Sequence, residues 1–177
     1  MFNWNKYNVI ASINVKGSRR NFFLLKKFLW VPVSMVLLIT GCNESKLAQC
    51  QRLIKTINEG TSLIEKNKGS QVTLSLGLAK DLKNVTKKIE RQNFKDPKLE
   101  DFKKQSVKHF ETFSKNIDTA AKALGSAKTA KVSSSGREQV RKAKKDIEIS
   151  LKQVSDAAKQ TDTLATELND YCAQTEQ

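Results

Sequence analysis

The chain has 177 residues, a formal net charge of +14 and 28% charged residues, with three cysteines, two methionines and a single histidine. This length fits one domain of ordinary size plus a terminal segment. An apolar content of 38% is low for a large core but normal for a lysine-rich helical protein, and one histidine with two methionines argues against haem ligation.

The first 41 residues have the order of a secretory signal: a basic start, an apolar segment, then small residues. Residues 1–27 carry six basic and no acidic side chains, and residues 28–41 carry no charge. Fourteen residues interrupted by Pro32 are fewer than the roughly 20 that a membrane-spanning helix needs. The alternative is an uncleaved anchor that begins at Phe22, and it would have to bury Lys26 and Lys27.

The apolar segment ends on four residues that resemble the lipobox of bacterial lipoproteins: Ile39, Thr40, Gly41 and Cys42. The resemblance implies diacylglycerol on the Cys42 thiol, removal of residues 1–41 by the lipoprotein signal peptidase, and acylation of the new amino terminus with a fatty acid such as palmitate. It covers only the first quarter of the chain. The competing interpretation is a chance cysteine that follows a core strand.

These assignments divide the chain into a signal peptide (1–41), a lipidated tether (42–46), an antiparallel helical bundle (47–172) and a tail (173–177). They place the mature protein in the bacterial envelope, facing the periplasm or the exterior, with a net charge of about +8. Residues 18–24 also resemble a twin-arginine export signal, although the same basic run suits an ordinary signal.

Apolar residues after Cys42 recur at spacings of three and four, which predicts four amphipathic helices. The first stripe is Leu47, Cys50, Ile54, Ile57, Thr61 and Ile64, and the second is Leu74, Leu78, Leu82, Val85 and Ile89. The third is Leu99, Phe102, Phe110, Phe113, Ile117, Ala120 and Leu124, and the fourth is Ile147, Leu151, Val154, Ala158, Leu164, Leu168 and Cys172.

Turn and capping residues separate these stripes. Gly69 followed by the capping residue Ser70 breaks the first from the second. Asp96 and Pro97 form an N-cap carboxylate with proline at the first helical position, and so start the third helix. Gly125 is expected to end that helix.

Residues 126–136 are small and polar and predict one long loop. Ser135 and Glu138 then have the spacing of a capping box for the fourth helix. Short first and second connections make neighbouring helices antiparallel, so we expect an all-α, up-down-up-down four-helix bundle. A long three-helix bundle is the alternative if Gly69 fails to break the first helix.

Two cysteines test this topology. Cys50 lies near the start of the first helix and Cys172 near the end of the fourth, and in an even-numbered antiparallel bundle those ends meet. An oxidising compartment would allow a disulfide there, whereas two buried free thiols are the alternative.

Catalytic patterns are absent from the sequence. His109 stands beside Phe110 on an aromatic-rich helix and is expected to be a boundary residue rather than a metal ligand. Nucleophile-elbow and phosphate-loop spacings are missing. With Cys42 acylated and the other two cysteines paired, no thiol is left for zinc. We therefore expect a protein without enzymatic activity, without a bound metal and without a cofactor.

Charge is concentrated at the end expected to lie far from Cys42, about 35–40 Å away by helix rise. This end has a net charge of about +7. Its cations are Lys66, Lys68, Lys122, Lys128, Lys131, Arg137, Arg141, Lys142, Lys144 and Lys145. They form either a solvated helix face or an anion-binding surface, for which the candidates are Arg137, Arg141, Lys142, Lys144 and Lys145.

The leading hypothesis is therefore a non-catalytic, lipid-anchored envelope protein with a structural or protein-interaction role. The first alternative is a binder of an anionic ligand: a cell-wall polymer, a lipid headgroup or an acidic protein. The second is a small-molecule carrier within the bundle. Nucleic acid is disfavoured by the compartment.

Overall fold

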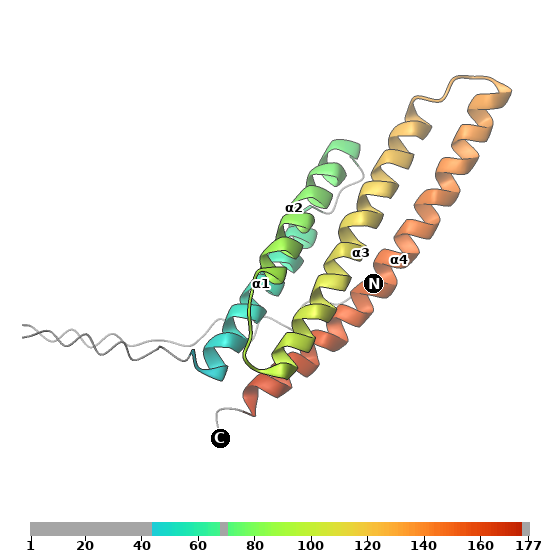
Figure 1. Ribbon diagram of the computed structural model, residues 1–177. Coiled ribbons are helices and arrows are strands. Elements are labelled where there is room, and N and C mark those ends of the chain that lie inside the picture. Colours follow the sequence, from blue (N-terminus) through green and yellow to red (C-terminus); the bar gives the residue numbers. More distant parts are fainter. Residues whose placement is uncertain (1–43, 68–70, 175–177) are drawn as a thin grey trace, which may run out of the picture. The chain divides into compact units, whose positions relative to one another are not determined.

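The computed structural model describes residues 44–67 and 71–174. The expected signal segment, the lipobox through Cys42, and Gly69 with Ser70 lie outside the described residues. Within the described part the fold is all-α, with helices α1 (Lys46–Lys66), α2 (Val72–Glu90), α3 (Pro97–Lys128) and α4 (Ser134–Ala173). Each helix packs antiparallel against its sequence neighbours (Figure 1), which confirms the four-helix architecture.

Side-chain caps fix three of the helix starts. Ser45 accepts a hydrogen bond from the Ala48 amide (3.1 Å) at the start of α1. Asp96 accepts from the amides of Lys98 (2.8 Å) and Leu99 (3.1 Å) at the start of α3, as the Asp96-Pro97 pair predicts. Each bond satisfies an amide that has no partner within its own helix.

The α3–α4 connection is shorter than the sequence predicts. Gly125 does not end α3, which continues to Lys128 and is capped at Thr129, because one interior glycine costs a helix only about 1 kcal/mol. The expected capping box is also wrong, since Ser133 is the N-cap of α4 and accepts from the Gly136 amide (3.0 Å). The backbone is so tight here that a Cβ on Gly136 would lie 1.8 Å from the Lys131 carbonyl oxygen.

All four helices contribute to one core. Phe102 and Phe110 of α3 are fully buried, and Gly60 of α1 lets the Phe110 ring approach closely. The buried apolar cluster consists of Cys50, Leu53, Ile57, Leu78, Leu82, Val85, Ile89, Leu99, Phe102, Phe110, Phe113, Ala157, Leu164, Leu168 and Cys172. Most of the stripes found in the sequence therefore face inward.

The helices differ greatly in length, and α1 ends about half-way along the bundle (Figure 1). Glu59 of α1 pairs with Lys88 of α2 (2.6 Å), and the hydroxyl of Ser114 on α3 donates to the Ala79 carbonyl of α2 (2.8 Å). This antiparallel register brings the end of α1 close to the level of Ser114. The remaining 14 residues of α3 extend about 21 Å further.

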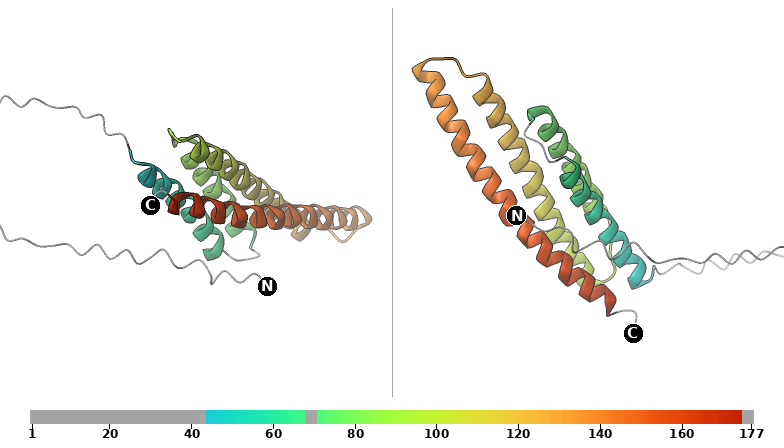
Figure 2. Two further views of the ribbon diagram at one scale, coloured as in Figure 1. Left: turned by 90° about the horizontal axis from the view of Figure 1, so that it is seen from below. Right: turned by 180° about the vertical axis from the view of Figure 1, so that it is seen from behind.

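Because the helices differ in length, the end of the bundle far from Cys42 is built from fewer segments than the sequence predicts. Lys66 closes α1 and therefore lies near the middle of the bundle, not beside the α3–α4 loop. We name residues 115–153, which comprise the end of α3, the loop and the first half of α4, the distal arms (Figure 2). They contain ten basic and four acidic residues, a net charge of +6. The 32 residues of α3 span about 48 Å, more than the expected 35–40 Å.

The inward face of α4 differs from its predicted stripe. Small residues at a seven-residue spacing are buried along the α3 contact: Gly136, Ala143, Ser150 and Ala157. The larger Leu151 is 56% exposed. On the other predicted stripes, Leu74 is 47% exposed and Leu47 is 37% exposed. Small side chains let α3 and α4 approach closely, so the larger apolar residues of α4 lie beside this contact instead of in it.

Among the described residues, no helix is both long enough and apolar enough to cross a membrane.

Candidate functional site

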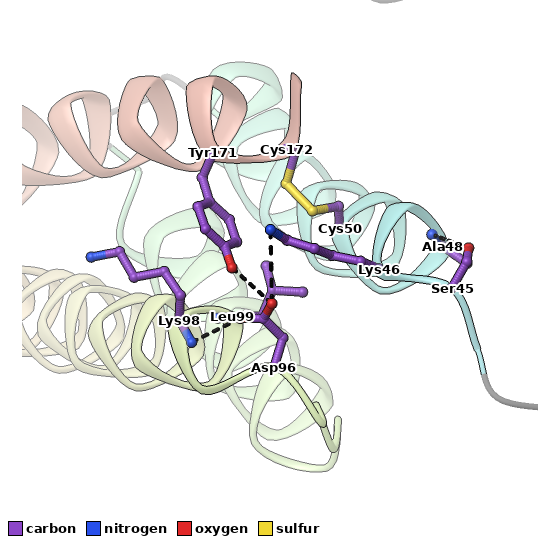
Figure 3. Close-up of a disulfide and its surroundings, with 9 residues drawn as sticks. All are labelled: Ser45, Lys46, Ala48, Cys50, Asp96, Lys98, Leu99, Tyr171 and Cys172. Atoms are coloured by element: carbon purple, nitrogen blue, oxygen red, sulfur yellow. Dashed lines mark hydrogen bonds and ion pairs between the residues drawn. A yellow bond between two sulfur atoms is a disulfide. The ribbon is translucent and has the colours of Figure 1, made fainter. Parts of the chain in front are cut away.

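The end of the bundle that holds the start of α1, the start of α3 and the end of α4 is closed by a disulfide. Cys50 and Cys172 are bonded, with their Cα atoms 6.0 Å apart (Figure 3), and both side chains are buried. The even number of helices brings these positions together, as the sequence predicts. The bond joins the first and last helices across 122 residues of sequence.

A polar network centred on Asp96 lies beside this bond (Figure 3). One carboxylate oxygen accepts a hydrogen bond from the Tyr171 hydroxyl (2.7 Å) and lies 3.9 Å from the Lys46 ammonium. Lys46 also lies 3.7 Å from the centroid of the Tyr171 ring. Asp96, Tyr171 and Lys46 thus connect α3, α4 and α1.

Burial alone would raise the pKa of the Asp96 carboxyl. Hydrogen bonds from Tyr171 and from the backbone amides of Leu99 and Lys98, together with the charge of Lys46, outweigh it and leave the pKa below its usual value. The carboxylate is therefore held in its charged form as a structural acceptor. The Asp96 cap was visible in the sequence, but its contact with Tyr171, 75 residues away, had no sequence signal.

Arg52 fixes the first described residues to the bundle. Its guanidinium forms two hydrogen bonds to the Glu44 carboxylate (3.0 and 2.7 Å) and one to the Asn93 carbonyl (3.0 Å), and it stacks 4.7 Å from the Phe94 ring centroid. The hydrogen bond from Arg52 lowers the pKa of Glu44. Glu44 is two residues from Cys42 in the sequence, so this contact ties the chain next to the predicted lipidation site to α1.

The five candidate anion-binding residues are all exposed on the first half of α4. At about 100° per residue, Arg137, Arg141 and Lys144 lie within about 60° on one face, whereas Lys142 lies about 140° from Arg137. The five cations therefore form a band around the helix rather than converge on one point.

Their ion pairs also differ. Arg141 pairs with Glu138, and Lys144 lies 3.8 Å from Glu148. Within the described part of the chain, Arg137, Lys142 and Lys145 form no ion pair. Surface pairs of this kind contribute little to stability. The band thus keeps a surplus of positive charge that is available to an anion.

The surroundings of His109 are those of a buried core residue and not of a metal ligand. It is buried, and its Nδ1 lies 3.2 Å from the Thr161 hydroxyl oxygen. The same hydroxyl lies 2.8 Å from the Ala157 carbonyl oxygen, to which it can donate; in that arrangement the imidazole donates from Nδ1. Burial, with a smaller contribution from the charge of Lys108, lowers the pKa of His109. Within the described residues no three His, Cys, Asp or Glu side chains form a group that could hold a metal ion.

No family model, no curated protein and no solved structure matches this chain.

Proposed function

We propose that this chain is a non-catalytic, lipid-anchored protein of the bacterial envelope that acts through structure or protein interaction. The observation that carries the proposal is the Cys50–Cys172 disulfide, because stable disulfides belong to oxidising compartments. The lipobox-like residues 39–42 supply the matching export and anchoring signal. In this proposal Cys42 bears the lipid, and the helical bundle follows within a few residues of the membrane.

Replacement of Cys42 tests the anchor. Wild type should incorporate a radiolabelled fatty acid and fractionate with membranes as a processed form. The Cys42→Ser variant should lose the label and accumulate as the unprocessed chain. Cys50→Ser with Cys172→Ser, which removes the other two cysteines, is the matched control and should retain the label. Labelling that persists in Cys42→Ser would refute the anchor.

Binding of an anionic ligand is the second candidate function, and the band of exposed cations on α4 favours it. Arg137, Lys142 and Lys145 have no ion pair in the described structure, and the distal arms have a net charge of +6. Such a surface attracts cell-wall polymers, lipid headgroups or acidic proteins, with an affinity that falls as salt rises.

Charge reversal tests this second function. We expect a partner co-purified from detergent-solubilised membranes to be lost when Arg141, Lys142, Lys144 and Lys145 are changed to Glu, and to dissociate as salt is raised. The charge-matched control reverses Lys55, Lys83, Lys104 and Lys159, which are exposed outside the distal arms. Equal loss in both variants would mean that total charge, and not this surface, retains the partner.

A further inference from the structure

The α3–α4 connection is the end of the bundle that lies farthest from the disulfide (Figure 1). We name residues 128–137, which include this connection and the first turn of α4, the tip. All of them belong to the described range 71–174. Helix α3 separates the tip by about 48 Å from the end where α1 begins and α4 ends. A surface that meets the tip end-on therefore lies far from the start of α1.

One apolar side chain projects from the tip. Val132 is fully exposed, and the backbone on both sides of it is held in place. The Ser133 amide donates to the Lys131 carbonyl (2.9 Å), and the Ser133 hydroxyl oxygen accepts from the Gly136 amide (3.0 Å). The Lys131 carbonyl also lies directly against Gly136. The valine is therefore kept in water at a defined position instead of packing on either helix.

Three cations surround Val132: Lys128 in the last turn of α3, Lys131 in the connection and Arg137 at the start of α4. All three are exposed, and among the described residues none of them forms an ion pair. Residues 128–137 contain no acidic side chain, and the adjacent Glu138 pairs with Arg141. The positive charge of the tip is therefore not neutralised by the described protein.

The distribution of this charge favours a flat anionic surface. The exposed cations of α4 form a band around the helix, so a ligand at one side meets only some of them. A plane that meets the helix end-on approaches every side of the band equally. Among anionic partners, a lipid bilayer offers acidic headgroups and, just beneath them, an apolar layer for Val132. An acidic polymer offers charge alone.

We propose that the tip docks end-on on the anionic surface of a lipid bilayer. Val132 inserts between the headgroups, and the three cations lie beside the lipid phosphates. This inference rests on the anionic-ligand function proposed above and names its ligand. Because the start of α1 follows Cys42 closely in the sequence, a chain that is also anchored at Cys42 would connect two membranes.

Vesicle capture tests the docking. The full chain, with a hexahistidine tag after residue 177, is held on neutral phosphatidylcholine vesicles that contain a nickel-chelating lipid. This attachment leaves the tip outward, because α4 ends at the opposite end of the bundle, and it does not depend on lipid at Cys42. We expect capture of fluorescent acceptor vesicles with about 30% phosphatidylglycerol, and at least about tenfold less capture of phosphatidylcholine acceptors. Raising the salt to about 0.5 M should release the acceptors.

Charge reversal assigns the contact to the tip. Changing all three tip cations to Glu should reduce capture by about a hundredfold or more, since each cation near an anionic bilayer contributes about fivefold. The charge-matched control reverses Lys83, Lys104 and Lys159, which are exposed outside the distal arms, and should stay within about threefold of wild type. Residues 1–27 are basic in every variant, so their contribution cancels in the comparison.

Replacement of Val132 distinguishes a bilayer from other anions. Val132→Ser should weaken capture by about threefold or more, and Val132→Trp should strengthen it, since tryptophan favours the membrane interface. Val140→Ser is the matched control, because Val140 is 44% exposed on α4 beyond the tip and end-on docking leaves it in water. Neither serine variant should change the binding of soluble polyglutamate. The fold should persist in each variant, which circular dichroism checks, since the replaced side chains are exposed.

Four results would overturn the proposal: equal capture of both acceptor types, capture unaffected by charge reversal at the tip, equal losses in Val132→Ser and Val140→Ser, or no loss in Val132→Ser. The last would assign the tip to an acidic polymer. Polyglutamate binding without vesicle capture would remove the bilayer and leave the anion-binding function, whereas failure of both would remove that function too. Fatty-acid labelling of Cys42 is independent of these outcomes.

Discussion

Two glycines show how far the effect of one residue depends on its neighbours. A Cβ on Gly60 would lie 2.2 Å from Cε1 of the buried Phe110 ring, whereas a Cβ on Gly77 would meet nothing within 4 Å. We expect Gly60→Ala to destabilise the bundle by about 1–3 kcal/mol through overpacking. Gly77→Ala should stabilise it by about 0.5–1 kcal/mol, since α2 loses a flexible interior residue.

Urea unfolding of the two variants measures this difference. The change is the same in both, a single methyl group within a helix, so the opposite signs isolate the close approach of Phe110. If Gly60→Ala were also stabilising, the tight α1–α3 contact would be wrong.

We expect the free energy of unfolding to depend on pH through His109, and a single substitution can isolate that contribution. Its pKa in the folded state is below the ordinary value of 6.5, so the unfolded chain binds a proton first as the pH falls. The stability contributed by neutral His109 is complete above about pH 6.5 and is lost as the pH falls from there through the folded-state pKa.

Thermal unfolding between pH 5.5 and 8 checks this expectation. The chain contains one histidine, so the decline in melting temperature toward pH 5.5 should disappear in His109→Gln. The glutamine amide can still donate to Thr161, which limits the loss of packing and hydrogen bonding. The same decline in the variant would show that another group titrates.

At the scale of the helix, α4 is the element whose face the sequence predicted least well. Its apolar stripe was found from the largest side chains, including Leu151, but the α3 contact uses Ala143 and Ser150. Hydropathy gives small residues little weight, although they allow two helices to approach closely. In contrast, the stripe of α2 from Leu78 to Ile89 is buried as predicted, because bulky side chains there fill the core.

Substitution on α4 distinguishes these two faces. The antiparallel register set by the Gln139–Ser126 and Tyr171–Asp96 hydrogen bonds brings Ala143 opposite Ala123. Ala143→Leu should therefore cost about 1–3 kcal/mol by forcing α3 and α4 apart. Leu151→Ser, at an exposed position, should change the free energy of unfolding by less than about 0.5 kcal/mol. Guanidinium unfolding that ranks the two in the opposite order would contradict the observed contact.

At the scale of the whole molecule, the disulfide joins the first and last helices at the end of the bundle where α1 and α3 start and α2 and α4 end. It closes a loop of 122 residues, for which the chain-entropy model gives about 4–5 kcal/mol. We expect the Cys50→Ser, Cys172→Ser double variant to lose roughly this free energy of unfolding. Adding a reductant should destabilise wild type by a similar amount and leave the double variant unchanged. A reductant effect that persists in the double variant would implicate a different group.

The topology was predictable from sequence because it rests on strong local signals: the periodic stripes, the Asp96-Pro97 start and the break after Asn67. The unequal lengths were not, because Gly125 and the serines of residues 126–136 favour turns locally while tertiary packing keeps most of that segment helical. The exposed cations of α4 were predictable from the sequence, because residues 137–145 were expected to be helical, whereas the ion pairs with Glu138 and Glu148 required the structure.

We propose that Cys42 carries lipid and begins the mature chain, and intact-mass spectrometry of the protein isolated from the envelope tests this proposal. We expect a chain starting at Cys42, with a mass increase corresponding to diacylglycerol plus an amide-linked acyl group and with two cysteines resistant to alkylation before reduction. A chain that retains residues 1–41, or one that begins elsewhere with Cys42 unmodified, would contradict it.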